Sequence, residues 1–246
     1  MHRFFLSPEC LKNGVVAFPS GTEHQLRRVL RLQAGQQVIV LDNLGSEFEV
    51  VLRSDAAGVL SGEVLASRRA EGEPQARLTL YLCLSQREKF EWMLQKCTEV
   101  GAAAFVPVIS RRSLVQDARA VEKKFPRWQK ILQEAAEQCE RGCIPTLGAV
   151  MPFTKAVAAA TASDVALIPW TGEHAYSLKR ALTGVPAEGG TVAALIGPEG
   201  GFSDEEAAAA REAGVQPVTL GKRILRMETA AVVTTAVVMQ LMGEMG

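Results

Sequence analysis

The sequence predicts an α/β protein with two parts, a small β-rich part over residues 1–70 and a larger one over 77–246. Three observations support this fold class. Short apolar strands separated by turn residues fill the first part. The polar stretch 68–76 contains Gly and Pro but no periodic apolar residue, as is typical of a boundary. Beyond it, apolar strands alternate with helical patterns, which predicts a mostly parallel sheet covered by helices.

The composition indicates a globular protein in a reducing compartment. The 246 residues are 48% hydrophobic and 22% charged, enough for a large core. No apolar run approaches the roughly 20 residues that cross a bilayer, and the first residues make a poor signal peptide. The five cysteines are an odd number in apolar contexts, so we expect a cytoplasmic protein without a membrane partner. Cys139 and Cys143 lack a second Cys or His pair, so we expect no metal.

The net charge of zero argues against a general nucleic-acid binder. Basic residues nevertheless concentrate in the first and middle thirds of the chain, with 12 Lys and Arg against 8 Asp and Glu in residues 77–141. A basic face on a neutral protein is compatible with this distribution, although the distribution does not require one.

The β-rich part contains one predicted helix, 22–31, with Thr22 as its N-cap. Its arginines, Arg27, Arg28 and Arg31, follow each other at helical spacing and should lie close together. A solvated helix face explains them as well as a binding surface does. The strands of this part are expected at 37–42, 47–52 and 60–65.

In the larger part, strands are predicted at 78–84, 104–109, 165–168 and 192–196, and helices at 89–100, 119–140, 174–182 and 228–243. Gly101 ends the first of these helices. Pro107 suggests that its strand lies at an edge or carries a bulge. The last helix is apolar nearly all round, so we expect it to be buried on most sides, either in the core or against a second subunit.

Two glycine-containing loops carry the strongest functional signal. They are Ile196-Gly-Pro-Glu-Gly-Gly-Phe202 and Leu220-Gly-Lys-Arg-Ile-Leu-Arg-Met-Glu-Thr-Ala230. Each follows a short apolar strand and leads into a helix; Ser203 and Glu206 form a capping box that predicts a helix start near Asp204. Glycine pairs before helices are often only turns. Neither loop matches a dinucleotide fingerprint or a P-loop. We predict that the loops form opposite walls of one cofactor pocket.

These loops resemble the two signature loops of the RsmE family, SPOUT-class methyltransferases that act on N3 of a uridine in 16S ribosomal RNA. The resemblance covers nearly the whole chain, and several motifs in the right order are more specific than any one alone. The further matches are Met1-His-Arg-Phe-Phe5, Lys89-Phe-Glu-Trp92, Gln95-Lys-Cys-Thr-Glu-Val-Gly101, Arg127-Trp128 with Ile131, and Glu134-Ala-Ala-Glu-Gln-Cys-Glu-Arg141 with Pro145.

The resemblance implies properties that periodicity cannot reveal. It implies a PUA-like RNA-binding barrel at the N-terminus and a SPOUT methyltransferase domain with a C-terminal trefoil knot, although knots run against general expectation. It also implies a homodimer that uses S-adenosylmethionine and acts on small-subunit ribosomal RNA or the 30S subunit.

The cofactor contacts that the resemblance implies come largely from main-chain groups of both loops. They are Leu195, Ile196, Gly197, Pro198, Glu199, Gly200, Leu220, Gly221, Ile224, Leu225, Arg226, Thr229 and Ala230. Pro169 and Trp170 could add a third wall, although a packing role explains Trp170 as well. The expected RNA contacts are Arg3, Arg27, Arg28, Arg31, Lys89, Lys96, Arg111, Arg112, Arg127 and Arg141, several of which can equally be surface charges.

Methylation of uracil N3 requires the proton on N3 to leave before or during attack. Arg226 is the predicted catalytic cation, because a positive charge beside a ring carbonyl stabilises the developing anion. Glu199 is predicted to orient the substrate or to assist deprotonation; a loop carboxylate held by a backbone donor is the alternative. Glu228 is expected to stabilise the dipole of the last helix.

Three alternative functions are therefore compatible with the sequence. The first is an RNA methyltransferase, for uridine N3 or another RNA base. The second is a non-catalytic RNA-binding protein with a PUA-like domain. The third is an α/β enzyme that binds a nucleotide cofactor through the glycine loops. Binding of S-adenosylmethionine separates the first from the other two.

Overall fold

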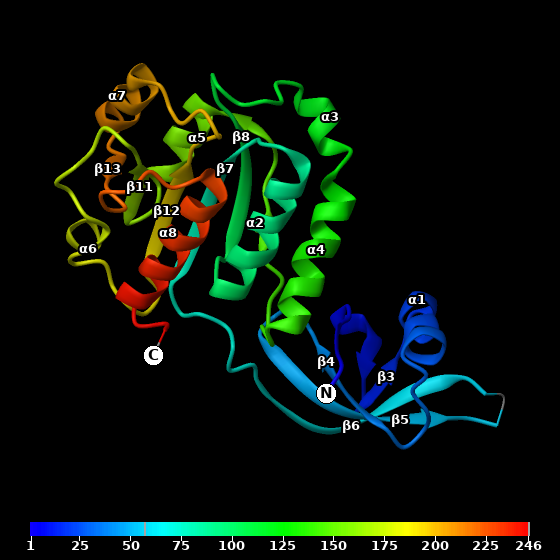
Figure 1. The fold of residues 1–246 in the computed structure, drawn as a ribbon. Coiled ribbons are helices and arrows are strands. Elements are labelled where there is room, and N and C mark those ends of the chain that lie inside the picture. Colours follow the sequence, from blue (N-terminus) through cyan, green and yellow to red (C-terminus); the bar gives the residue numbers. More distant parts are fainter. Residues whose placement is uncertain (57, 246) are drawn as a thin grey trace. The chain divides into compact units, whose positions relative to one another are not determined.

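The computed structural model describes residues 1–56 and 58–245. It divides into two compact units, the first made of residues 1–73 and 136–144 and the second of residues 74–135 and 145–246. One unit contains a curled, largely antiparallel sheet and the other a parallel sheet (Figure 1). The chain therefore has a mixed α/β fold, and the first unit takes a segment from the middle of the sequence.

The sheet of the first unit has the strand order β1-β4-β5-β6-β3-β2. Neighbours are antiparallel except β1 and β4, which are parallel. Its side chains that face inward, among them Phe4, Val16 and Val40, form one apolar core. The strands are β1 Arg3–Phe5, β2 Leu11–Lys12, β3 Val15–Ala17, β4 Gln37–Leu41, β5 Ser46–Ser54 and β6 Leu60–Arg69, with a short helix η1 at Pro8–Cys10.

The helix predicted at 22–31 differs in the structure. Helix α1 covers Ser20–His24 with Pro19 at its N-cap, so Thr22 lies inside the helix and the predicted cap was wrong. A π-helical turn, η2 Gln25–Val29, follows it. The reason is tertiary: Leu26 is fully buried in the core of the unit, and packing overrides the capping signal.

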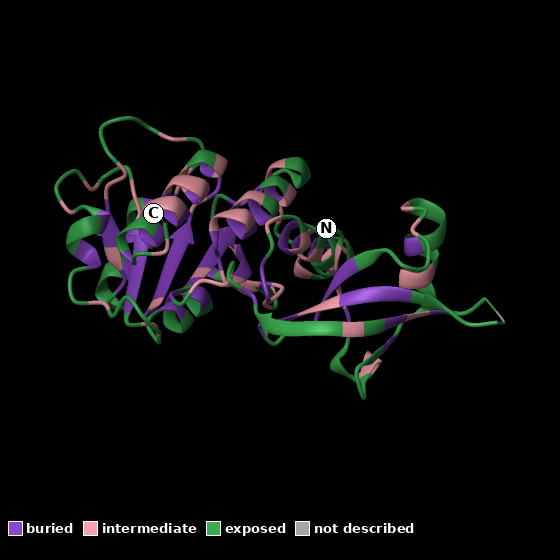
Figure 2. Cartoon of the chain, turned by 90° about the horizontal axis from the view of Figure 1, so that it is seen from below, coloured by how far each residue is buried: buried purple, intermediate pink, exposed green. Residues whose placement is uncertain are grey.

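The sheet of the second unit has the strand order β10-β8-β7-β12-β11-β13, and β9 also pairs with β8. All of these pairs are parallel. The strands are β7 Arg77–Cys83, β8 Ala104–Ile109, β9 Thr146–Leu147, β10 Met151–Pro152, β11 Val165–Pro169, β12 Thr191–Ile196 and β13 Gln216–Val218. The central strands are buried because helices cover both faces of the sheet (Figure 2).

The helices of this part of the chain are α2 Arg87–Val100, α3 Ala118–Glu122, α4 Phe125–Gln138, α5 Phe153–Ala160, α6 Leu178–Ala181, α7 Asp204–Glu212 and α8 Met227–Leu241. Helix α8 packs against α2, β7 and β12. Its buried residues are Met227, Ala231, Thr234, Thr235, Val238 and Met239, whereas Val232, Val233, Ala236 and Val237 on its other side are half-buried. No helix among the described residues is long and apolar enough to cross a membrane.

Two predicted helices are shorter than expected. The helix predicted at 119–140 is broken into α3 and α4; Pro126, which has no N–H to donate, falls in the first turn of α4. The helix predicted at 174–182 begins only at Leu178. Glu173 accepts the backbone N–H groups of residues 174–176, and these residues therefore form a turn.

Pro107 lies in an interior strand. Strand β8 runs between β7 on one side and β9 and β10 on the other, so the predicted edge position was wrong. The register explains why proline is tolerated: β9 reaches only Phe105, and β10 begins opposite Val108. Phe105 O accepts from Gly148 N on that side. The backbone nitrogen of Pro107, two residues further on, faces the same side of β8. It lies opposite the gap between β9 and β10, where no strand requires an N–H donor.

Candidate active site

The first glycine loop connects β12 to α7. Ser203 Oγ accepts from Glu206 N at 3.2 Å, and Glu206 Oε2 accepts from Ser203 N at 3.0 Å, which confirms the predicted capping box and the helix start at Asp204. The loop itself turns at Gly201, whose φ is +67°, and Gly201 N donates to Pro198 O at 2.8 Å. A tight turn therefore holds the loop over the end of β12.

The second glycine loop connects β13 to α8. Thr219 Oγ1 accepts from Gly221 N at 3.1 Å, and Gly221 has a φ of +103°, a conformation that residues with a side chain rarely adopt. Helix α8 then starts at Met227 with Arg226 as its N-cap residue. The glycine thus lets the chain leave β13 and turn toward α8.

A third segment follows β11. Trp170 N donates to Val218 O at 3.1 Å, which ties this segment to β13. Glu173 Oε1 accepts from three consecutive backbone N–H groups, those of residues 174–176, at 2.8 to 3.0 Å. The hydrogen bond from Ala175 N is the largest of the causes that lower the pKa of Glu173, so the carboxylate is ionised at neutral pH.

The three segments wall one cavity of about 570 Å³. Strands β12, β11 and β13 are adjacent and parallel, so their carboxyl ends open at the same edge of the sheet. The volume lies within the range of roughly 300–1,000 Å³ that is usual for small-molecule sites. Both glycine loops therefore line the same cavity, as the sequence analysis predicted.

Most of the predicted cofactor residues line this cavity. They are Ile196, Gly197, Pro198, Glu199, Gly200, Leu220, Gly221, Ile224, Leu225 and Ala230, together with Pro169 and Trp170 of the third wall. Leu195 is buried in β12, and Arg226 and Thr229 lie in exposed positions next to lining residues. What any of these residues binds stays a prediction.

Several lining residues are not among those predicted from the sequence. They are Thr171, Glu173, His174, Gly201, Phe202, Thr219, Lys222, Arg223 and Met227. Gly201, Phe202, Lys222, Arg223 and Met227 lie inside the two quoted motifs, and Thr219 precedes the second motif by one residue, so the motifs taken whole could have found them. Glu173 and His174 carry no such signal, since they approach the cavity only because β11 and β13 pair in the sheet.

The two predicted catalytic side chains differ in their surroundings. Glu199 Oε1 lies 3.4 Å from Lys89 Nζ and 3.5 Å from Gln86 N, at the start of α2. Arg226 is exposed, and its side chain forms no hydrogen bond or ion pair with any residue that the structure describes. Glu199 is therefore held by its neighbours, whereas the guanidinium group of Arg226 is available to a ligand.

The predicted RNA contacts of the second unit are exposed or, like Lys89 and Lys96, half-buried, and each has a partner. Arg127 binds Glu91 through two hydrogen bonds of 2.6 and 2.8 Å, which lower the pKa of Glu91. Lys96 lies 2.8 Å from Glu99, Arg111 lies 3.4 Å from Glu205, and Arg112 donates to main-chain oxygens of the first glycine loop. Of these four cations, only Arg112 contacts a segment that lines the cavity.

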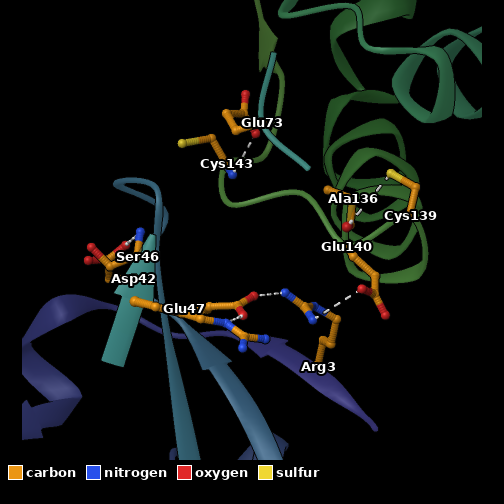
Figure 3. A network of polar contacts seen from close by, with 10 residues as sticks. Arg3, Asp42, Ser46, Glu47, Glu73, Ala136, Cys139, Glu140 and Cys143 are labelled. Atoms are coloured by element: carbon orange, nitrogen blue, oxygen red, sulfur yellow. Dashed lines mark hydrogen bonds and ion pairs between the residues drawn. The ribbon is translucent and has the colours of Figure 1, made fainter. Parts of the chain in front are cut away.

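In the first unit, two predicted RNA contacts are buried in ion pairs, and Figure 3 shows that of Arg3. The Arg3 guanidinium donates to Glu47, and the side chains are 8% and 5% exposed. Arg141 is 2% exposed and lies 2.7 Å from Glu73. Both guanidinium groups are therefore occupied within the protein, and the RNA contacts of Arg3 and Arg141 stay a prediction. The Arg3 ion pair links β1 to β5, and the Arg141 ion pair links the segment 136–144 to Glu73.

The remaining arginines of the first unit are exposed. Arg27 lies 3.0 Å from Glu23 and also donates to the carbonyl of Gly58. Arg28 and Arg31 are exposed, and Arg31 has a φ of +56° outside the helical turns. Among the described residues, no group of three or more Asp, Glu, His or Cys side chains could hold a metal ion.

Comparison with known proteins decides the family. Residues 71–239 match the model of the RNA methyltransferase domain. The chain is 35% identical to ribosomal RNA small subunit methyltransferase E of Synechocystis over 96% of this chain and 76% of that protein. It is 30% identical to the Bacillus subtilis protein of the same name, over 94% and 93% of the two chains.

The chain belongs to the RsmE family. A crystal structure of the Neisseria gonorrhoeae member, bound to S-adenosylmethionine, superimposes with a TM-score of 0.85 at 31% identity and covers 98% of both chains. RsmE relatives thus match this chain across both of its units, including the residues before 71 that lie outside the domain model.

Proposed function

We propose that this chain transfers the methyl group of S-adenosylmethionine to N3 of a uridine in 16S ribosomal RNA, either free or in the 30S subunit. One observation of the structure supports the proposal most directly. Two glycine loops, neither of which matches a dinucleotide fingerprint or a P-loop, line a single cavity at the carboxyl edge of a parallel sheet. The names of the relatives and the S-adenosylmethionine bound to the gonococcal protein support the same reading.

The cavity suits such a cofactor. Its wall combines apolar side chains, such as Leu220, Leu225 and Trp170, with main-chain groups that glycines leave accessible. The proposed contacts are those of the two loops, with Leu195, Arg226 and Thr229 acting from positions beside the cavity. When bound, S-adenosylmethionine supplies an electrophilic methyl group, and a preformed wall that excludes water favours its alignment with the nucleophile.

The proposed roles of the two polar residues follow from charge. Deprotonation of uracil N3 places negative charge on the ring carbonyls, and the unpaired guanidinium of Arg226 stabilises that charge. Glu199 accepts the N3 proton or orients the base through it. Because Lys89 holds the carboxylate 3.4 Å away, Glu199 is set in place before the substrate arrives.

We further propose that the curled sheet of the first unit is a PUA-like barrel that binds RNA, and that the second unit is a SPOUT domain. Arg27, Arg28 and Arg31, which are exposed, would contact phosphates and give affinity without sequence choice. We place the reaction in the cytoplasm, consistent with an odd number of cysteines in apolar sequence contexts.

The trefoil knot and the homodimer are also proposals. The half-buried apolar face of α8, formed by Val232, Val233, Ala236 and Val237, supports a second subunit on this helix. Sedimentation at micromolar concentration should give a dimer, and Val233→Glu should give a folded monomer. A wild-type monomer would contradict the dimer, and a crystal structure whose chain passes through no loop would contradict the knot.

The decisive experiment uses 30S subunits and 16S RNA from a strain that lacks this protein. We expect methyl transfer from labelled S-adenosylmethionine, followed by a stop of reverse transcription at one uridine, because N3 lies on the pairing edge of the base. RNA binding without binding of S-adenosylmethionine would favour a non-catalytic RNA-binding protein. Preference for a dinucleotide would favour another α/β enzyme, and label on a different base would correct the target atom.

A further inference from the structure

Arg112 extends from the segment after β8 to the first glycine loop. Its Nη1 atom donates to Gly200 O at 2.8 Å and lies 3.5 Å from Phe202 O. A side-chain carbon added at Gly200 would lie 3.5 Å from both Cβ and Cδ of Arg112, so the aliphatic part of the side chain also packs against this loop. Arg112 therefore contacts the main chain of a segment that lines the cavity.

The base of Arg112 is itself fixed. Ser110 and Ser113 are buried and bind each other through the Ser110 N to Ser113 Oγ bond of 3.0 Å and the Ser113 N to Ser110 O bond of 3.1 Å. Gln116 Nε2 donates to both of their carbonyls, at 3.1 and 2.8 Å. The neighbouring Arg111 N donates to Glu206 Oε1 at 2.9 Å. The Arg112 side chain thus projects from a hydrogen-bonded turn, which the bond from Arg111 N to Glu206 links to α7.

The loop that Arg112 contacts cannot fix its own shape in the same way. Gly197, Gly200 and Gly201 have no side chains to pack, and glycine loses more conformational freedom on ordering than any other residue. A ligand that binds main-chain groups requires those groups to be held in position, and the affinity falls when binding itself must order them. Besides the turn from Gly201 N to Pro198 O, contacts from outside the loop therefore help to hold it.

We infer that Arg112 is a positioning residue for the cofactor site, which clamps the loop Gly197–Phe202 through its carbonyl oxygens. This role differs from the RNA contact that the sequence predicted for it, and it rests on the proposed binding of S-adenosylmethionine in the cavity. Arg112 touches the loop and holds its main chain in the shape that the cofactor meets.

The first test measures the loop without any cofactor. Hydrogen exchange by mass spectrometry should show faster exchange of the amides of residues 199–203 in Arg112→Ala than in wild type. Arg119→Ala is the matched control, because Arg119 is an exposed arginine at the start of α3 with no contact to the loop. Equal exchange in Arg112→Ala, Arg119→Ala and wild type would overturn the clamp.

The second test separates the two ligands. Calorimetry should show S-adenosylmethionine affinity about tenfold weaker in Arg112→Ala, partly restored in Arg112→Lys and unchanged in Arg119→Ala. KM for S-adenosylmethionine should rise with it, while RNA affinity falls equally in the two alanine variants. Unchanged cofactor affinity with a large, selective loss of RNA affinity would overturn the inference and make Arg112 a phosphate contact. Failure of the wild type to bind S-adenosylmethionine would refute the proposed function, and the exchange result would still decide the clamp.

Discussion

The Nζ atom of Lys89 lies 3.4 Å from Oε1 of Glu199, so an ion pair joins the start of helix α2 to the loop that follows β12. Both side chains are about one-third exposed, 31% and 28%. The family resemblance implies an RNA contact for the lysine and a catalytic role for the carboxylate. In the structure the two charges neutralise each other beside the cavity, which makes the pair a link between the predicted substrate and cofactor surfaces.

Glu199→Gln should lower kcat at neutral pH about 100-fold, because the amide keeps the shape of the side chain but cannot accept the N3 proton. The affinity for S-adenosylmethionine should change little. Single-turnover methylation of 30S subunits measures the first quantity and calorimetry the second. A decrease in kcat of less than threefold would assign Glu199 to holding the loop.

Lys89→Met should lower kcat severalfold, since an ion pair of this exposure contributes only about 0.2–1 kcal/mol. Its effect should vanish in the Glu199→Gln background, because the lysine then has no carboxylate to hold. Lys130→Met, which removes an exposed lysine paired with Glu134, is the control. Additive effects of the two substitutions on kcat would show that Lys89 and Glu199 act independently.

Arg226→Ala should reduce kcat about 10²–10³-fold while the Kd for S-adenosylmethionine changes less than about threefold. The reason is that the guanidinium is exposed and forms no hydrogen bond or ion pair with the described residues, so its removal should leave the fold intact. Lys179→Ala, an exposed cation on α6, should behave as wild type. Equal turnover in Arg226→Ala and wild type would remove this residue from the mechanism.

Gly221→Val should weaken cofactor binding at least tenfold. Valine at a φ of +103° is strained by about 1–3 kcal/mol, and the loop will relax away from the cavity. Gly184→Val is a matched control, since Gly184 has a φ of +88°, has nothing within 4 Å of an added Cβ, and lies outside the cavity lining. If both variants bound S-adenosylmethionine equally weakly, the loss would be due to general destabilisation and not to the loop at Gly221.

Glu47→Gln should destabilise the first unit by about 3 kcal/mol, because it removes the carboxylate that binds the buried Arg3 guanidinium most closely and leaves only Glu140, 3.6 Å away. Burial alone would raise the pKa of Glu47, but the hydrogen bonds and positive charges of Arg68 and Arg3 outweigh it and the pKa is lowered from 4.5. The stabilisation is therefore complete above about pH 4.5 and is lost as pH falls through the lowered value.

The difference between wild type and Glu47→Gln should shrink on acidification. All three tryptophans lie outside the first unit, so hydrogen exchange of the first-unit amides is the suitable measurement. Glu63→Gln, which removes an exposed partner of Arg53, should have an effect below about 1 kcal/mol. A pH-independent difference between Glu47→Gln and wild type would contradict the assigned ion pair.

The sequence predicted local features well where neighbouring residues decide them. The capping box of Ser203 and Glu206 and the left-handed Gly101 at the end of α2 both depend on residues a few positions apart. Two predictions failed where contacts between distant residues decide the structure. The predicted Thr22 N-cap is overridden by the packing of Leu26 in the core, and the gap between β9 and β10 allows Pro107 in an interior strand.

The sequence by itself determined the alternation of strands and helices, the two glycine loops and the family resemblance, because periodicity, caps and motifs are written in consecutive residues. Only the tertiary structure decided that β11 brings Glu173 to the cavity, that Arg112 contacts the glycine loop, and that Arg3 and Arg141 are buried in ion pairs. The partners in these contacts lie 44 to 90 residues apart or on neighbouring strands. Strand order and side-chain burial, which no local pattern records, bring them together.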